Sequence, residues 1–124
     1  MKRNPSARDV VLFFYQGKHR TGVVLDFDKS ARAAIVAYGT RTFREQLNVT
    51  LRHGTPMCNA LKLSDTTYFY PEHIVMVDLE VLRPKAHAHC LHGLILELKR
   101  LYENAVRPLA CVGKQPVEEL NISG

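Results

Sequence analysis

The spacing of apolar residues changes once along this chain, and that change constrains the fold more than any other feature. Up to Pro84, apolar residues alternate with polar ones or form short β-branched and aromatic runs, which is typical of strands. From Ala86 they recur every three or four residues, which predicts a helix over residues 86–105 with one apolar stripe. The stripe consists of Leu91, Leu94, Ile95, Leu98, Leu101 and Tyr102. Many short strands followed by one helix predict a mainly β domain.

Turn-forming residues divide the β part into six predicted strands. They are expected at residues 9–15, 21–27, 32–38, 47–51, 66–70 and 73–82. The polar segment 16–20 is short enough to join the first two strands as a hairpin. Pro71 is expected to end the fifth strand, because proline has no N–H to donate to a sheet. The pattern alone leaves open an SH3-like barrel, an OB-fold and a small sandwich.

The chain length bounds the domain organisation. With 124 residues, 46% of them hydrophobic, the chain fits one domain with a real core. We place that domain at residues 1–107, including the helix of residues 86–105, and expect a polar C-terminal tail over residues 108–124. No apolar run is long enough to cross a bilayer, and the N-terminal residues lack the features of a signal peptide. These features predict a cytoplasmic protein that does not contact membranes.

Cysteine and histidine residues give little indication of a redox or metal site. Cys58, Cys90 and Cys111 are odd in number and widely spaced, so we expect buried free thiols. Three histidines lie close together at the start of the predicted helix, namely His87, His89 and His92. Their spacing matches no zinc pattern, and only the last two would be neighbours on a helix. We therefore expect a polar first helical turn there, and neither a metal nor a cofactor.

Positive charge is concentrated in the first half of the chain. The net charge is +5, but residues 1–62 hold 11 Lys and Arg against four Asp and Glu, whereas residues 63–124 hold six against eight. An excess of this size attracts a polyanion, and nucleic acid is the usual one. A solvated basic face without a ligand is the alternative interpretation.

Three segments resemble a known family. They are Arg-Asp-Val-Val-Leu-Phe-Phe-Tyr at 8–15, Lys-His-Arg-Thr-Gly-Val-Val-Leu at 18–25 and Ala-Ile-Val-Ala-Tyr-Gly-Thr at 34–40. Residues 8–42 resemble the opening of the PemK/MazF family of toxin ribonucleases. The resemblance implies a small SH3-like β-barrel for the single domain, and the periodicity adds the C-terminal helix of residues 86–105, which has no secure counterpart in the family pattern. The resemblance also implies a homodimer, an antitoxin protein as partner, and metal-independent endoribonuclease activity on single-stranded RNA.

Two residues carry over from the family as catalytic, Arg20 and Thr40. In metal-independent RNA cleavage the RNA's own 2′-hydroxyl attacks the adjacent phosphate and leaves a cyclic phosphate. An arginine offers fixed charge and a fork of donors for the phosphate oxygens, and a threonine hydroxyl offers one more hydrogen bond. If both end neighbouring strands at one rim, they can share a phosphate. Thr21 follows Arg20 where the family usually has proline.

Other side chains on the same two predicted loops are candidates for RNA contacts. Those expected to bind the RNA backbone are Lys18, His19, Arg41 and Arg44. An imidazole can also transfer a proton near neutral pH, which adds a role for His19. Tyr15 or Tyr38 could stack on a base, although a buried position in the barrel is the alternative for each. Two other function classes stay open: a non-catalytic module binding nucleic acid or protein on the same fold, and a structural oligomer.

Overall fold

The computed structural model describes residues 10–113, so Asp9 and the segment 114–124 of the expected tail lie outside the described residues. The elements in chain order are β1 (Val10–Tyr15), β2 (Lys18–Asp28), β3 (Ala33–Thr40), β4 (Val49–Leu51), α1 (Pro56–Ala60), β5 (Thr67–Asp78), the 3-10 turn η1 (Leu79–Val81), β6 (Arg83–Pro84), α2 (His92–Tyr102) and β7 (Cys111–Val112). The expectation of a mainly β fold with a late helix is confirmed.

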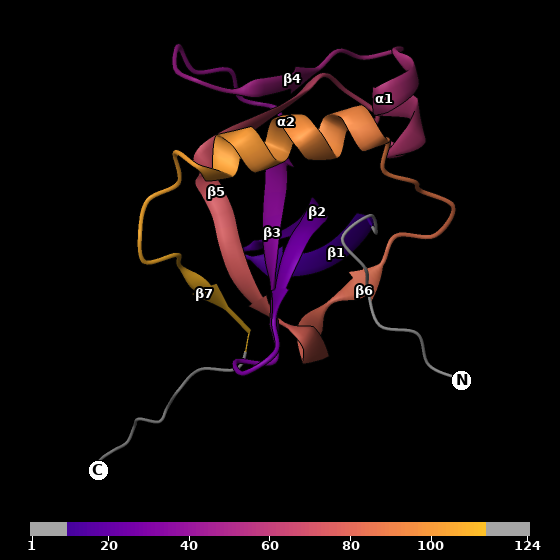
Figure 1. Ribbon diagram of the computed structural model, residues 1–124. Helices are drawn as coiled ribbons and strands as arrows, with labels where there is room; N and C mark the ends of the chain where they lie inside the picture. The colour runs from indigo at the N-terminus through magenta and orange to yellow at the C-terminus, as the bar shows by residue number, and fades with distance from the viewer. Residues whose placement is uncertain (1–9, 114–124) are drawn as a thin grey trace.

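Within these residues, seven strands form one sheet (Figure 1). Its order is β4-β5-β3-β2-β1-β6, and β7 pairs with β5 as well. All neighbours are antiparallel except β5 and β7. β4 and β6, at the two ends of the path, are not paired with each other in the described part of the chain. The sheet therefore keeps two edges, and β7, formed by residues assigned to the expected tail, pairs along part of β5.

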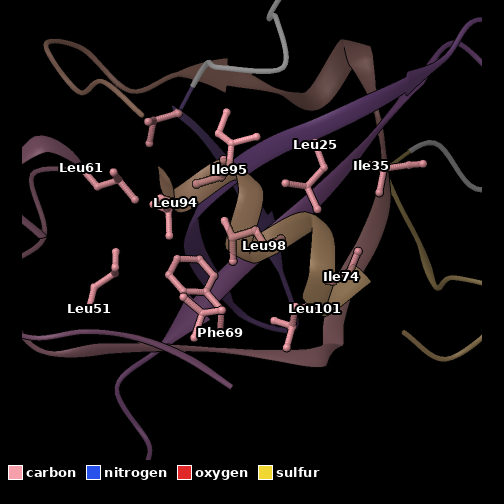
Figure 2. Close-up of a cluster of buried hydrophobic side chains, with 14 of the residues drawn as sticks. Leu25, Ile35, Leu51, Leu61, Phe69, Ile74, Leu94, Ile95, Leu98 and Leu101 are labelled. Carbon is pink, nitrogen blue, oxygen red and sulfur yellow. The ribbon is translucent and has the colours of Figure 1, made fainter. Parts of the chain in front are cut away.

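Both faces of the sheet are buried. On one face α2 crosses the strands and buries Leu94, Leu98 and Leu101 against Leu25 and Phe69 (Figures 1 and 2). We call this the helix-side core. The opposite core lies on the other face and consists of Val11, Phe13, Val24, Ala34, Val36, Tyr38, Val75, Val77, Leu82 and Val112. Because successive strand residues point to opposite faces, two buried faces require strands that are apolar at every position, as in residues 33–38.

Pro71 does not end a strand, which corrects the sequence-based expectation. Residues 67–78 form one continuous strand, β5. Its register on β3 passes from Gly39↔Phe69 to Ala37↔Ile74, so four residues of β5 lie opposite Tyr38 alone. Proline is tolerated in such a bulge, because the ladder hydrogen bonds are interrupted there. The bulge also directs a histidine, His73, toward Tyr38.

The boundaries around the two helices also differ from the expectation. α2 begins at His92 rather than near residue 86, since residues 86–91 form no regular element. The expected polar first turn containing His87 and His89 is therefore wrong. The sequence analysis did not predict α1, whose short length gives no periodic signal. Its N-terminus is nevertheless capped: the Thr55 hydroxyl accepts a hydrogen bond from the Cys58 amide, and Pro56 occupies the first turn.

The cysteines are free but only one is fully buried. Cys58 lies in the helix-side core, Cys90 is half-buried, and Cys111 is exposed on β7. The expectation of buried thiols is thus confirmed for Cys58 and wrong for Cys111. Burial raises the pKa of the Cys90 thiol to about 12, so it stays protonated and unreactive at neutral pH.

Between residues 10 and 113, neither helix has the length and apolar content that a membrane-spanning helix needs.

Candidate functional site

A cleft of about 310 Å³ opens where β2 begins and β3 ends. It collects residues from both strands, from the segment after α1, from the start of β5 and from the residue that follows β6. The lining consists of Lys18, His19, Arg20, Thr21, Gly39, Thr40, Arg41, Lys62, Leu63, Ser64, Thr67 and Lys85. Five of the six site residues expected from the sequence are in this set, and Arg44 is the exception.

The basic segment 18–20 belongs to a strand and not to a loop, which corrects the sequence-based assignment. A two-residue turn, Gln16-Gly17, has positive φ at both positions, 53° and 77°. This is the backbone geometry of the tight turns that match the twist of a hairpin. Tyr15 and Lys18 pair directly across the turn, and the ladder continues without a break. The basic side chains therefore project from a rigid strand at fixed spacing.

The sheet register brings Arg20 and Thr40 toward each other. The last pair between β2 and β3 at this end is Gly22↔Tyr38. The same register, continued two residues beyond this last pair along each strand, would place Arg20 opposite Thr40. By alternation both side chains lie on the face that Tyr38 occupies, and both line the cleft. Arg20 and Thr40 therefore lie at one rim of the sheet, beside the same cleft.

The Arg20 side chain is held in position from two sides. Its Nε donates a hydrogen bond to the Tyr15 carbonyl oxygen at 3.1 Å. Its guanidinium carbon lies 4.9 Å from the centroid of the Tyr38 ring, a cation–π contact. Among the described residues, neither terminal nitrogen of Arg20 has a hydrogen-bond acceptor. These nitrogens remain available for an anion, with the orientation of the side chain already fixed.

Tyr38 is not a base-stacking platform, because the residue is only 3% exposed. Instead, His73 stacks on it with ring centroids 4.6 Å apart and an interplanar angle of 14°. Tyr15, which is half-buried, contacts the Tyr38 ring edge-on at 5.8 Å. Burial raises the pKa of Tyr38 and lowers the pKa of His73. The result is a neutral aromatic stack that supports Arg20 from beneath.

Sequence reasoning missed His73, because a single histidine at the start of a predicted strand carries no signal. Its Nδ1 atom is buried and has no hydrogen-bond partner among the described residues. A neutral imidazole tolerates this better than a charged one, which agrees with the lowered pKa. Only the bulge in β5 reveals the contact with Tyr38, and bulges cannot be located from one sequence.

The two arginines of segment 41–48 each have a carboxylate partner. Arg41 forms an ion pair with Asp65 at 2.8 Å, and Arg44 forms one with Glu72 at 2.7 Å. The Arg41 hydrogen bond lowers the pKa of Asp65. Exposed pairs of this kind contribute about 0–1 kcal/mol, so a phosphate can compete for Arg41. Arg44 lies outside the cleft, with its guanidinium carbon 5.4 Å from the Tyr70 ring centroid.

Two further lysines line the cleft, Lys62 and Lys85, and the sequence analysis did not single them out. Both lie beyond the segment that carries the family resemblance. With Lys18, Arg20 and Arg41 they give the cleft five cationic side chains, and no Asp or Glu is among its described lining residues. A concave surface with this charge attracts an extended polyanion.

The described residues hold no group of three or more His, Cys, Asp or Glu side chains able to bind a metal ion. His87, His89 and His92 are exposed, and the first two precede α2. Comparisons with protein-family models, with curated proteins and with solved structures found no match to this chain.

Proposed function

We propose that this chain is a toxin-like endoribonuclease that cleaves single-stranded RNA without a metal ion. One observation carries the proposal: Arg20 and Thr40 line the same face of one cleft, at positions related by the β2–β3 register. The cationic lining supports binding of a polyanion. The assignment of RNA and of metal independence rests on the resemblance of residues 8–42 to PemK/MazF toxins.

In the proposed reaction a 2′-oxygen of RNA forms a bond to the adjacent phosphorus, and the bond from phosphorus to the 5′-oxygen breaks. The 2′-hydroxyl loses its proton and the leaving oxygen gains one, so the products are a 2′,3′-cyclic phosphate and a 5′-hydroxyl. Arg20 stabilises the charge that builds on the phosphate oxygens, and Thr40 donates a hydrogen bond to them. His19 also lines the cleft, but by alternation it lies on the other face of β2 from Arg20, beside Phe14, so we do not assign it the proton transfer.

The finer features implied by the resemblance belong to the same proposal. Bulges in β2 and β5 bend the sheet, and we propose that it is an open variant of the SH3-like barrel. The active species is a cytoplasmic homodimer, and a cognate antitoxin protein is its partner. Exposed apolar side chains, among them Phe14, Phe43 and Leu47, offer surface for such contacts.

The test is incubation of the purified protein with a long single-stranded RNA in excess EDTA, followed by mapping of the product ends. We expect cleavage in the chelator and a 2′,3′-cyclic phosphate, or its opened form, on upstream fragments. RNA that is bound but never cut would overturn the enzymatic proposal and leave a nucleic-acid-binding module. Cleavage that EDTA abolishes would overturn metal independence alone.

A further inference from the structure

The cleft extends over both faces of β2, and its two sides differ. Arg20 points to the face of the opposite core, where it contacts Tyr38. Thr21, the next residue, points by alternation to the face that carries Val23 and the helix-side core. On that second side the cleft is bounded by Lys62, Ser64 and Lys85. The rim of the sheet at the start of β2 thus has cationic side chains on both faces of the sheet.

Lys85 is fixed in this second side of the cleft. Its backbone amide donates to the Val10 carbonyl at 2.8 Å, which continues the pairing between β1 and β6 by one residue. Its ammonium donates to the Thr21 hydroxyl at 3.3 Å and to the Lys62 carbonyl at 3.1 Å. An ammonium has three N–H donors, so one remains after these two bonds. That donor belongs to a cation that is already ordered and needs little further entropy loss to bind.

Among the described residues, no carboxylate is a hydrogen-bond or ion-pair partner of Lys85. Both of its described acceptors are neutral oxygens, and no Asp or Glu is among the described residues that line the cleft. Its side chain is half-buried, and burial lowers the pKa of Lys85. A partly desolvated cation with neutral partners gains more from an anion than a fully solvated lysine does. Lys62, exposed beside it, adds a second positive charge to the same place.

We propose that Lys85 and Lys62 form a second phosphate subsite, which takes the phosphodiester next to the one bound by Arg20 and Thr40. The polynucleotide strand then crosses the rim of the sheet at the start of β2, with one phosphate on each face of the sheet. The ligand class is a single strand with at least two consecutive phosphodiester linkages. This inference rests on the proposed function only for the identity of the polyanion as RNA.

The test uses the full chain and oligonucleotides that cannot be cut, because every 2′-oxygen is methylated. A trinucleotide without terminal phosphates has two linkages, and either can be made neutral as a methylphosphonate. Binding is followed by chemical-shift titration for wild type and for Lys85→Gln. In wild type each neutral linkage should weaken binding. In Lys85→Gln, one of the two methylphosphonate substitutions should not weaken binding any further. That linkage is the one bound at the second subsite, and the lysine that contacts it has already been removed.

A mixed-sequence 2′-O-methyl 12-mer supplies the second measurement, by fluorescence anisotropy against salt. Lys85→Gln should lower the log–log salt slope by about 0.7, the value for one phosphate, and weaken low-salt binding roughly tenfold. Lys62→Gln, at the same phosphate, should lower the slope by a smaller amount. Lys85→Arg keeps the charge and should keep the slope. Lys29→Gln, an exposed lysine at the far end of β2, is the matched control and should behave as wild type. Thermal melting checks that each variant is folded.

The outcomes separate this inference from the proposed function. In one outcome, wild type cuts RNA, but Lys85→Gln and Lys62→Gln bind with the wild-type salt slope and are weakened by each neutral linkage as wild type is. That outcome overturns the second subsite and leaves the proposed nuclease activity standing. If wild type binds with the predicted coupling but never cuts, the subsite stands on a binding module. If wild type binds no oligonucleotide at low salt, both proposals are overturned.

Discussion

Two short segments each carry two Lys or Arg residues in the sequence and have different surroundings in the structure. Residues 18–20 lie on β2, and among the described residues no carboxylate pairs with them. Segment 41–48 is a loop whose two arginines form ion pairs with carboxylates, Arg41 with Asp65 and Arg44 with Glu72. The Tyr70 hydroxyl, which accepts from the Arg44 amide and donates to the Thr42 carbonyl, holds the same loop from below.

The difference shows that the net charge of a segment does not measure its availability to a ligand. On β2 the strand supplies rigidity, so no acid is needed to order the basic side chains. In the loop the carboxylates supply order and neutralise part of the charge at the same time. We therefore expect RNA contacts to be concentrated on β2 and to weaken from Arg41 to Arg44.

The largest expected effect is on cleavage. Arg20→Ala should lower kcat/KM for RNA cleavage by about 10²–10³, because it removes the charge that stabilises the transition state. Arg44→Ala should change it by less than about threefold, since that side chain lies outside the cleft. The measurement is initial-rate cleavage of one fluorescent RNA, with urea melts as the check on folding. Equal losses for the two variants would remove the proposed distinction between the segments.

Substitution of Thr40, which is proposed to bind the same phosphate, should lower the rate of cleavage by a smaller factor. Thr40→Ala should slow cleavage about tenfold, which corresponds to the loss of about one hydrogen bond to a charged group. Thr40→Ser keeps the hydroxyl and should retain most of the rate. The comparison is made in single-turnover reactions, so that chemistry and product release are separated. If serine were as damaging as alanine, the hydroxyl would not be the group that acts.

Salt dependence sharpens the contrast between the two segments. Lys18→Gln should reduce the log–log slope of RNA affinity by about 0.7, the value for one lost phosphate contact on a single strand. Arg44→Gln should leave the slope within error of wild type. Affinities measured with uncleavable RNA at four salt concentrations give both slopes. A larger change for Arg44 than for Lys18 would contradict the assignment.

Removing a carboxylate partner should make a basic side chain of segment 41–48 available to RNA, as the basic side chains of β2 are. Glu72→Gln keeps an oxygen for the Gln46 hydrogen bond but releases Arg44 from its charged partner. RNA affinity should then rise about two- to threefold, with a slightly steeper salt slope, because one negative charge is lost near the cleft. The same anisotropy assay measures it. Unchanged affinity would show that the pair does not restrain Arg44.

The smallest effect concerns pH and the stack beneath Arg20. Burial lowers the pKa of His73, with Glu72 acting to raise it and Arg44 and Arg20 to lower it. Between that lowered value and the ordinary value near 6.5, the unfolded chain binds more protons, so stability falls as pH falls through this window. In His73→Phe the loss of unfolding free energy between pH 7.5 and pH 5 should be smaller than in wild type.

Urea melts of both proteins at the two pH values test this expectation. His53→Asn, a change at an exposed histidine, is the control and should follow wild type. If His73→Phe lost as much stability as wild type on acidification, the protonation of His73 would not be the cause.

The sequence predicted most of the fold where periodicity was strong. The strand at residues 10–15 and the stripe of Leu94, Leu98 and Leu101 follow from the sequence pattern. The strand observed at residues 33–40 was expected at 32–38, so its last two residues were missed. The predicted positions at which the helix begins and the strands end were less accurate, because these boundaries depend on local contacts. Pro71 lies inside β5, for example, since a bulge interrupts the ladder there.

The candidate site was predicted in part. Motif positions led to Arg20 and Thr40, and the register then explains why they share a rim. Lys62, His73 and Lys85 come from segments that meet the cleft only after folding, so no spacing in the sequence connects them. The carboxylate partners of Arg41 and Arg44 are likewise 24 and 28 residues away along the chain.

The close packing around Gly39 limits which amino-acid substitutions this part of the cleft tolerates. A Cβ atom built at this position would lie 2.2 Å from the Thr67 Cγ2 atom and 3.3 Å from the Phe69 ring, so β3 and β5 meet here without room for a methyl group. In a library randomised at positions 39 and 40 and selected for a folded, active protein, we expect glycine alone at 39. Position 40 should accept serine as well as threonine. The residue beside the proposed catalytic threonine would then be the less replaceable of the two, for reasons of space and not of chemistry.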